Sequence, residues 1–287
     1  MRETWCVMEE SAVWFPIVRY GDDAGGSLEV PVPREERVVL YVNGREWVGW
    51  MCTPTWLEEL AVGFLFNEGF IDGMEEVAHV RVCGSGRCVD VWLEKDVDPP
   101  GLPTVTSGCS GGTTFETMRE ERAPLTSRVG ITPEQVVGLV QRLRQAAAVY
   151  RLAGGIHTSA LAEGNRLACV AEDVGRHNTV DKLAGYCLRR GLPMRDRILL
   201  TSGRVSSEML AKAARMGTPI VISLTSSTSL AVDLARAWNI TLIGYARGRG
   251  FRVYAGEHRI QPRGTTGTPP TSLSVEHRRD AEDAGDS

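Results

Sequence analysis

The chain has 287 residues, 43% of them hydrophobic, and can therefore bury a large core in one or two domains. Its formal charge of -4 at pH 7 argues against a nucleic-acid or membrane-surface protein. Because no secretion signal begins the chain and no apolar run reaches the length of a spanning helix, we expect a cytoplasmic protein that binds neither nucleic acid nor membrane.

The first 130 residues predict a lead-in followed by a small β-rich domain. Residues 1–36 are rich in turn-forming residues and are expected to be loosely ordered, and residues 37–130 form the β-rich domain. Asn43-Gly44 separates two β-rich runs, which is the strongest short signal for a hairpin. The apolar spacing after Pro54 predicts one helix, which ends at Gly69.

The seven cysteines are expected to be reduced, because an odd number at irregular spacing is unlike a secreted disulfide framework. Cys83 and Cys88 flank the turn of a second predicted hairpin. No second pair stands at zinc spacing, so cross-strand neighbours explain these two better than a metal site does. The cysteines are Cys6, Cys52, Cys83, Cys88, Cys109, Cys169 and Cys187.

Cys109 lies in a stretch of small and polar residues, 104–114, that has no apolar periodicity. A thiol on such a loop can reach a partner and carry sulfur, provided that something lowers its pKa. The alternative is a loop cysteine without a role. The residues around Cys109 do not separate the two interpretations.

A second domain is predicted over residues 131–258, followed by a disordered tail over 259–287. Thr132-Pro133-Glu134-Gln135 is a capping box that begins a long helix, and Gly154-Gly155 ends it. The apolar stripe of this helix comprises Val136, Val140, Leu143, Ala147 and Tyr150.

Four apolar strand-like runs follow and alternate with amphipathic helical patterns. This alternation predicts an α/β domain with a largely parallel sheet that helices cover on both faces. The runs are 167–171, 197–201, 219–224 and 240–246.

Polar residues gather where these strands end, at the edge where open α/β sheets bind ligands. Hydroxyls, glycines, arginines and helix N-termini suit phosphates and a polar heterocycle, so they predict a site for a nucleotide-like anion. Gly175 is expected to adopt a backbone conformation that a Cβ would oppose. Structural roles stay open, since His177 could pair with Asp173 or Asp181, and His157 could be a core histidine.

Several motifs resemble the FdhD/NarQ family, over roughly residues 30 to 255. The resemblance implies a cytidine deaminase-like α/β domain with a smaller β-rich N-terminal domain, and a homodimer. It also implies a sulfurtransferase that passes persulfide sulfur from a cysteine desulfurase to the molybdenum of the bis(molybdopterin guanine dinucleotide) cofactor. That cofactor is then inserted into the formate dehydrogenase apoenzyme, whose activity requires the transfer. The motifs are Asn43-Gly44, Thr53-Pro54, the segment 60–69, Gly154-Gly155-Ile156-His157, the segment 172–182, Ser202-Gly203-Arg204 and the run 245–250.

The resemblance also implies roles for single residues, with Cys109 as the persulfide carrier. The cofactor is a bound substrate, and the protein needs no catalytic metal of its own. We hypothesise that Asp173 accepts hydrogen bonds from guanine, and that Arg204 and Arg247 face phosphates. Cofactor contacts are implied for Tyr245, Ala246, Arg247, Gly248, Arg249 and Gly250, and a guanine-nucleotide pocket for His157, Asp173, Gly175, Arg176, His177, Asn178, Ser202, Gly203 and Arg204.

Two departures from related sequences bear on the chemistry. Many family members carry Cys-x-x-Cys on the loop, whereas Cys109-Ser110-Gly111-Gly112 keeps one thiol, which leaves the release of sulfur unexplained. The zinc motifs of deaminases are missing, so zinc deamination is not expected. The alternative function is a non-enzymatic chaperone that binds and delivers the cofactor. A nucleotide hydrolase is disfavoured because base and metal ligands are missing.

Overall fold

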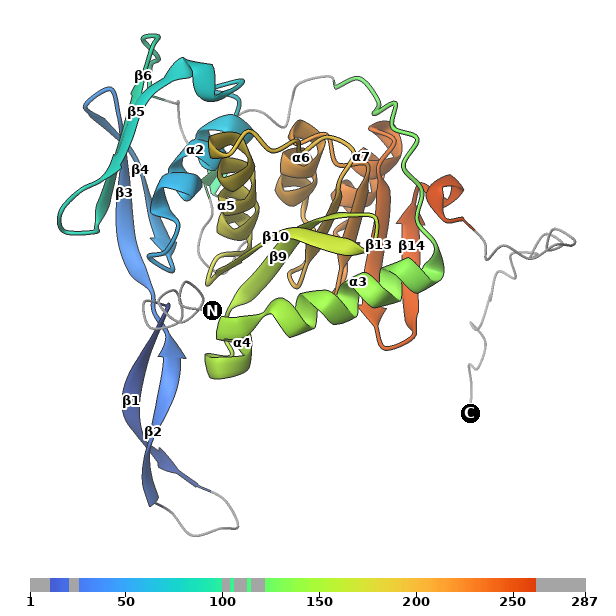
Figure 1. Ribbon diagram of the computed structural model, residues 1–287, viewed down its shortest axis with the longest axis horizontal. Coiled ribbons are helices and arrows are strands. Elements are labelled where there is room, and N and C mark those ends of the chain that lie inside the picture. Colours follow the sequence, from blue (N-terminus) through green and yellow to red (C-terminus); the bar gives the residue numbers. More distant parts are fainter. Residues whose placement is uncertain (1–10, 21–25, 100–103, 106–112, 115–121, 262–287) are drawn as a thin grey trace, which may run out of the picture.

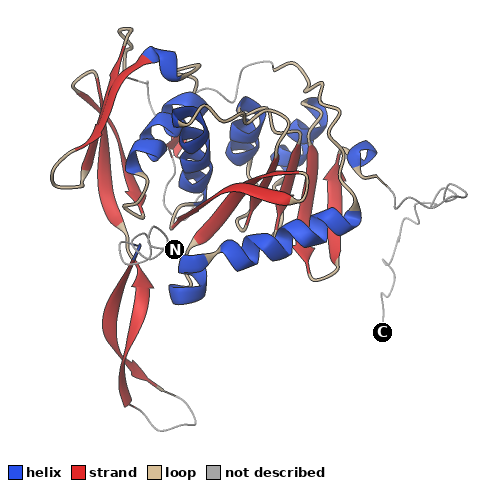
Figure 2. Cartoon of the chain, viewed as in Figure 1, coloured by secondary structure: helices blue, strands red, loops and turns tan. Residues whose placement is uncertain are grey.

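The computed structural model describes residues 11–20, 26–99, 104–105, 113–114 and 122–261. A four-stranded sheet and a six-stranded sheet flank a pair of helices, and a two-stranded arm projects away from both sheets (Figure 1). Figure 2 shows that strands form this arm along its whole described length. The first part contains β1 (Ala12–Arg19), β2 (Gly26–Pro33), β3 (Glu36–Val42), β4 (Arg45–Cys52), α2 (Leu57–Asn67), η1 (Met74–Glu76), β5 (Val77–Val82), β6 (Cys88–Leu93), β7 (Thr104–Val105) and β8 (Thr113–Thr114).

Both predicted hairpins of the β-rich part are present, in a sheet of order β4-β3-β6-β5. Asn43 and Gly44 both have positive φ, of 48° and 77°, as the turn between β3 and β4 requires. The helix predicted after Pro54 is α2, which packs on one face of this sheet.

The larger sheet has the order β10-β9-β11-β12-β13-β14 and is mixed. Its strands and helices are α3 (Pro133–Ala146), α4 (Ala148–Ala153), β9 (His157–Glu163), β10 (Arg166–Asp173), α5 (Arg176–Arg189), β11 (Ile198–Thr201), α6 (Ser207–Arg215), β12 (Ile220–Ser223), α7 (Ser229–Ala237), β13 (Thr241–Arg247), β14 (Gly250–Ala255) and η3 (Glu257–Arg259).

The prediction of a largely parallel sheet was wrong. Only the β11-β12 and β12-β13 pairs are parallel, and β9, which we did not predict, lies antiparallel between β10 and β11. We did not predict β9 because it begins with the polar residues His157, Thr158 and Ser159, although most of the strand is buried. Because β10, β11, β12 and β13 still run in one direction, their carboxyl ends share one edge of the sheet.

Helices cover both faces of this sheet, as predicted. Alternate strand residues such as Leu200 and Ile222 pack against α3 on one face. Their neighbours Leu199 and Val221 pack against α5, α6 and α7 on the other. In Figure 1, α3 crosses the lower part of the sheet, and α5, α6 and α7 lie above the strands. No helix among the described residues is long and apolar enough to cross a membrane.

The capping box at Thr132 is confirmed, but the helix it begins is shorter than predicted. Thr132 accepts a hydrogen bond from the Gln135 N–H, and the Gln135 side chain accepts one from the Thr132 N–H. The helix breaks at Ala147 because the Glu172 carboxylate, at the end of β10, accepts from the N–H groups at the start of α4. Tyr150, expected in the apolar stripe, is consequently 56% exposed.

The two sheets are joined by the packing of α2 against α5, which lie side by side in Figure 1. A Cβ on Gly63 would overlap the carbonyl oxygen of Asp181, and a Cβ on Gly185 would overlap that of Glu59. The two helix backbones therefore touch, which no larger residue at either glycine would allow.

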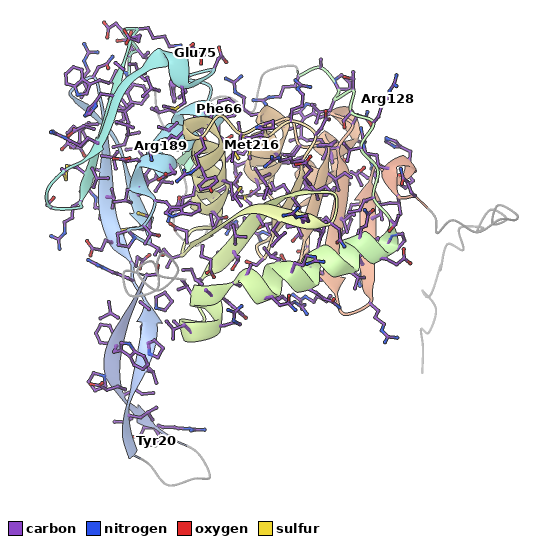
Figure 3. All side chains as sticks on the ribbon, in the orientation of Figure 1. Tyr20, Phe66, Glu75, Arg128, Arg189 and Met216 are labelled. Atoms are coloured by element: carbon purple, nitrogen blue, oxygen red, sulfur yellow. A yellow bond between two sulfur atoms is a disulfide. The ribbon has the colours of Figure 1, made fainter. Side chains whose placement is uncertain are left out.

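Part of the expected lead-in forms regular structure, because β1 and β2 pair along their full length as an antiparallel arm. The root of the arm lies near α4, where a Cβ on Gly155 would be 3.5 Å from Pro33. Figure 3 shows large side chains along the arm, with Tyr20 at its far end. Residues 1–10, 21–25 and 262–287, which include most of the expected tail, lie outside the described residues.

One part of the cysteine prediction was wrong, because Cys83 and Cys88 form a disulfide across the turn between β5 and β6. The prediction that they are cross-strand neighbours agrees with this bond. The free cysteines of the described chain, Cys52, Cys169 and Cys187, are all buried.

Candidate functional site

The predicted site residues meet at the edge where β10, β11, β12 and β13 end. His157, the first residue of β9, pairs directly with Asp173, the last of β10. The turn after β11 is tied to β9, because the Ser202 N–H donates to the Thr158 carbonyl and the Thr158 N–H donates to Ser202 Oγ, at 2.8 and 2.9 Å. The structure thus brings residues from two separate sequence motifs into one place.

The connections continue along the same edge to the last predicted motif. Val205 and Ser227 form an isolated parallel bridge, which joins the turn after β11 to the loop after β12. The N–H of Tyr245 in β13 donates to the Thr225 carbonyl of that loop at 2.8 Å. The run 245–250 therefore belongs to the same edge as Ser202.

Asp173 is 0% exposed, and the protein occupies both of its carboxylate oxygens. Oδ1 accepts from the Gly175 N–H and the Asn178 side-chain amide at 2.8 and 2.9 Å. Oδ2 accepts from the Thr53 N–H at 3.2 Å and lies 2.6 Å from Lys182 Nζ. No oxygen of Asp173 faces solvent, so this geometry favours a supporting role beneath the site over direct contact with guanine.

Gly175 is required for space and not for an unusual backbone conformation. Its φ is -96°, which any residue adopts, so the expectation of a conformation that a Cβ opposes was wrong. A Cβ there would instead lie 2.6 Å from the Asn178 amide nitrogen, in the middle of the hydrogen bonds around Asp173. The turn that begins α5 is therefore packed closely around the Asp173 carboxylate.

His157 lies at the start of β9, between the ends of β10 and β11. Its Nδ1 is 3.5 Å from Ser202 Oγ, and a Cβ on Gly203 would be 3.4 Å from Nδ1 and 3.1 Å from Arg176 Cβ. Burial, and then the positive charge of Arg176, lower the pKa of His157. The imidazole is consequently neutral near pH 7 and can either donate or accept a hydrogen bond.

His177, in the first turn of α5, pairs with Glu208 and not with Asp173 or Asp181. Its Nε2 is 3.3 Å from Glu208 Oε2 and 3.4 Å from Ser206 Oγ. Burial lowers the pKa of His177, although the hydrogen bond with Glu208 acts in the opposite direction. Glu208 was not predicted as a site residue. The sequence feature that could have identified Glu208 is its position in the first turn of α6, the helix that follows β11.

A second buried charge cluster underlies α5. Lys212 Nζ lies 2.8 and 2.7 Å from the two Asp181 carboxylate oxygens and 3.2 Å from Glu68. Although burial alone would lower the pKa of Lys212, Asp181 and Glu68 raise it above the usual value. The lysine is therefore charged, and it ties α6 to both α5 and the end of α2.

The run 245–250 forms the end of β13 and the turn to β14. Tyr245 has a φ of 50°, and the Arg252 guanidinium lies 4.3 Å from its ring centroid. Arg247 donates from Nε to the Leu224 carbonyl at 2.7 Å, which fixes an exposed guanidinium at the edge. Ala246 is buried in the core, so its side chain faces away from any ligand.

Charged groups at the edge favour an anion. The side chains of Arg204, Arg247 and Arg249 are exposed there, while those of Arg176 and Asn178 are buried at the start of α5. Gly248 has a φ of 59° in the turn, and Gly250 has open space where a Cβ would stand. Within the described residues, no three His, Cys, Asp or Glu side chains are grouped so as to hold a metal ion.

Cys109 lies outside the described residues. The short antiparallel pair of β7 and β8 flanks the stretch that contains it. Its predicted role therefore stays a prediction.

Comparison with known proteins now identifies the family. The model of the FdhD/NarQ family matches residues 33–261. The chain belongs to the FdhD/NarQ family. Proteins of Staphylococcus aureus strains MRSA252 and Newman, both named sulfur carrier protein FdhD, are 37% identical to it over 251 residues, which are 85% of this chain and 95% of each relative.

The fold is also shared with a solved relative. The crystal structure of a formate dehydrogenase accessory protein from Desulfotalea psychrophila superposes with a TM-score of 0.75 at 27% identity, over 87% of this chain and 99% of that one. The predicted family and α/β fold class are thus confirmed. The site edge described above lies within the residues that the family model matches.

Proposed function

We propose that this protein is a sulfur carrier that takes persulfide sulfur from a cysteine desulfurase and passes it to the molybdenum of the bis(molybdopterin guanine dinucleotide) cofactor for formate dehydrogenase. The name of the Staphylococcus aureus relatives supports sulfur carriage, and that of the solved relative supports a role for formate dehydrogenase. The observation that carries the cofactor part is the sheet edge, where Arg204, Arg247 and Arg249 are exposed on the edge that also holds the neutral His157. Guanidinium groups are well suited to the phosphates of a dinucleotide.

Each part of the edge has a role in binding this substrate. Arg247, fixed by the Leu224 carbonyl, binds a phosphate, and Arg204 on the neighbouring turn binds another. His157 offers one ring nitrogen to the nucleotide. Asp173 and Lys182 position the turn that begins α5 and do not touch the substrate.

Cys109 is the proposed carrier. Its thiolate attacks the terminal sulfur of the desulfurase persulfide, so that a new S–S bond forms on Cys109 and the desulfurase cysteine leaves as a thiolate. The protein is then an enzyme in the sense that a covalent persulfide forms on it and is passed on.

A cofactor chaperone is the second candidate, and the single thiol in the sequence around Cys109 favours it. Mass spectrometry separates the two. We expect the reduced protein to gain one thiol-reducible sulfur atom after incubation with cysteine and its desulfurase, and Cys109→Ala to gain none. Cys169→Ala, which removes a buried thiol, is the matched control and should load normally. An unloaded wild-type protein that still binds the cofactor would establish the chaperone.

We further propose that the protein is a homodimer and that the β1-β2 arm is its contact surface. Trp14 of β1 is 58% exposed, Tyr20, which follows β1, is 90% exposed, and further large apolar side chains are exposed on β1 and β2. A two-stranded hairpin has only marginal stability in water by itself. The apolar side chains of this arm should therefore be buried permanently against another protein surface. A second copy of the chain is always available to bury these side chains, whereas a partner protein that binds only transiently would leave them exposed to water after it dissociates.

The composition of the arm supports contact through its faces. Within β1 and β2 the charged residues are Arg19 and Glu29, and such scarcity of charge is typical of the buried centre of an interface. Pro16 and Pro31 lack an N–H, which limits the addition of further strands at the edges. The exposed apolar side chains are Val13, Trp14, Phe15, Ile17, Val18, Tyr20, Leu28 and Val32.

A further inference from the structure

We infer that Cys83 and Cys88 form a second thiol site, which accepts a sulfane sulfur when reduced and releases it as hydrosulfide when the disulfide forms. The inference rests on the proposed sulfur-carrier function, because it concerns how the sulfur leaves the protein. The site would take small, negatively charged persulfides.

The two sulfur atoms are close enough to bond, and the backbone keeps them so. Cys83 follows β5 and Cys88 begins β6, and their side chains form the disulfide. The Cys83 N–H donates to the Cys88 carbonyl at 2.9 Å, which closes the turn independently of the sulfur atoms. Reduction should therefore leave the two thiols facing one another.

The surroundings of the two sulfur atoms differ, and this difference assigns their roles. Cys83 Sγ lies 3.0 Å from the Cys88 backbone nitrogen, which donates to it, and 3.1 Å from Ser85 Oγ. Hydrogen bonds to sulfur stabilise a thiolate, so Cys83 is the nucleophile of the reduced pair. Cys88 is then the resolving thiol.

A charged hollow adjoins the pair. It has a volume of about 480 Å³ and is lined by Glu35, Glu36, Arg37, Val39 and Arg87. Val39 of β3 stands directly opposite Cys88 in the parallel ladder, and Arg87 immediately precedes Cys88. Arg87 lies 3.4 Å from Glu36, which also pairs with Arg34, and Arg37 lies 3.7 Å from Glu46. The side chains of Arg87 and Arg37 are 73% and 65% exposed, so the carboxylates of a ligand can replace these weak surface pairs, while Glu35 can bind an ammonium group. Glutathione persulfide carries all of these groups and has the size of a small peptide.

The chemistry balances in two steps. The Cys83 thiolate attacks the terminal sulfur of the incoming persulfide, which forms a persulfide on Cys83 and releases the donor thiolate. The Cys88 thiolate then attacks Cys83 Sγ, so that the disulfide forms and hydrosulfide leaves. The sulfane sulfur gains two electrons, and the two thiols lose them. A dithiol of the thioredoxin class, or two small thiols, must reduce the disulfide before the next cycle.

The Cys83–Cys88 pair supplies a second thiol, which the sequence around Cys109 lacks. Sulfane sulfur becomes sulfide only with two electrons, and a single cysteine provides no partner thiol with which to form a disulfide. Cys109 is followed by serine and two glycines, whereas Cys83 and Cys88 are joined in the structure. The pair can thus act as a dithiol that reduces the sulfane sulfur of a small persulfide to hydrosulfide.

The test uses reduced full-length Cys109→Ala protein with glutathione persulfide as the probe, without oxygen. We expect roughly one hydrosulfide to be released per chain and two thiols to be lost, with Cys83 joined to Cys88 in the peptide map. Cys83→Ser/Cys88→Ser in the same background gives the baseline. Cys88→Ser in that background should retain one extra sulfur on Cys83 and release no hydrosulfide above the baseline.

Two results would overturn the inference: hydrosulfide release at the baseline level when Cys83 and Cys88 are both present, or a disulfide that thiols do not reduce in the folded protein. Because Cys109 is absent from these variants, the outcome is separate from the proposed carrier. Loading of Cys109 by a desulfurase with no reaction at Cys83 would refute this inference alone. Reaction at Cys83 without loading of Cys109 would instead contradict the proposed function.

Discussion

Asp173 and Lys182 form an ion pair with 2.6 Å between Oδ2 and Nζ, and their side chains are 0% and 1% exposed. The pair connects three parts of the chain. Lys182 also donates to the Thr53 carbonyl at 3.0 Å, and the Thr53 N–H donates to Asp173 at 3.2 Å. The connection between the two sheets therefore passes directly beneath the turn that begins α5, so the stability of the domain contact and the shape of the site depend on the same charges.

Removal of one partner should be costly. Lys182→Met leaves the Asp173 carboxylate buried without its cation, and we expect a loss of about 3–5 kcal/mol in the free energy of unfolding. Lys95→Met removes the half-exposed pair with Glu76 and should cost at most about 1 kcal/mol. Urea unfolding at pH 7 measures both. Equal effects of the two substitutions would show that the buried pair has no special role.

The two site histidines predict a dependence of stability on pH. Burial lowers the pKa of both His157 and His177 in the folded protein relative to the usual value of 6.5. As the pH falls below about 6.5, the unfolded chain binds protons before the folded chain does, so stability should decrease until the folded-state pKa values are reached. His157→Gln should reduce this slope in urea midpoints measured between about pH 7.5 and 5. A slope unchanged in His157→Gln and in His177→Gln would contradict the assignment.

Local signals in the sequence were sufficient for the hairpin at Asn43-Gly44 and for the capping box at Thr132, because each depends on a few adjacent residues. They were insufficient for β9, whose ladder depends on partners far along the chain. The break before α4 has the same origin, since Glu172, which caps it, lies more than twenty residues away. Contacts that are distant in sequence thus account for the errors in the fold.

In the candidate site, too, features that depend on nearby residues were predictable and contacts between distant segments were not. The strand ends placed Ser202 and Arg247 at one edge without knowledge of the full sheet order, because strands that run in one direction end at one edge. His157 begins β9, a strand that was not predicted, so only the family resemblance assigned it to this site. The sequence could not show that Asp173 is enclosed by Lys182 and Thr53, which come from distant segments. A carboxylate at a strand end looks the same whether it faces a ligand or a buried lysine.

Gly63 and Gly185 should tolerate no side chain. Gly63→Ala would place a Cβ against the Asp181 carbonyl oxygen, and separating α2 from α5 should cost at least about 1–3 kcal/mol. Gly84→Ala, at a turn with open space around the added Cβ, is the control and should have little effect. Thermal unfolding followed by circular dichroism compares them. A Gly63→Ala protein as stable as wild type would show that the helices can separate freely.

Arg247 should contribute to nucleotide affinity without contributing to stability. Its guanidinium is exposed and bonded to one carbonyl, so Arg247→Ala should bind guanosine diphosphate roughly tenfold more weakly, as expected for the loss of one charged phosphate contact. Arg142→Ala removes the same charge from the exposed face of α3 and should leave the affinity unchanged. Isothermal titration calorimetry at one fixed salt concentration gives both values. Equal affinities for wild type and Arg247→Ala would remove the run 245–250 from the binding site.

The β1-β2 arm should decide the oligomeric state. Trp14→Ser/Phe15→Ser removes two large exposed aromatic side chains, and if the arm is buried against a second copy, the dimer should dissociate at concentrations at least about tenfold higher than wild type. Leu230→Ser changes a half-exposed apolar side chain on α7, away from the arm, and should leave the dimer intact. Light scattering during size-exclusion chromatography over a range of concentrations measures the mass. A wild-type monomer at every concentration would refute the dimer, and a dimer that persists in the double variant would place the interface on another surface.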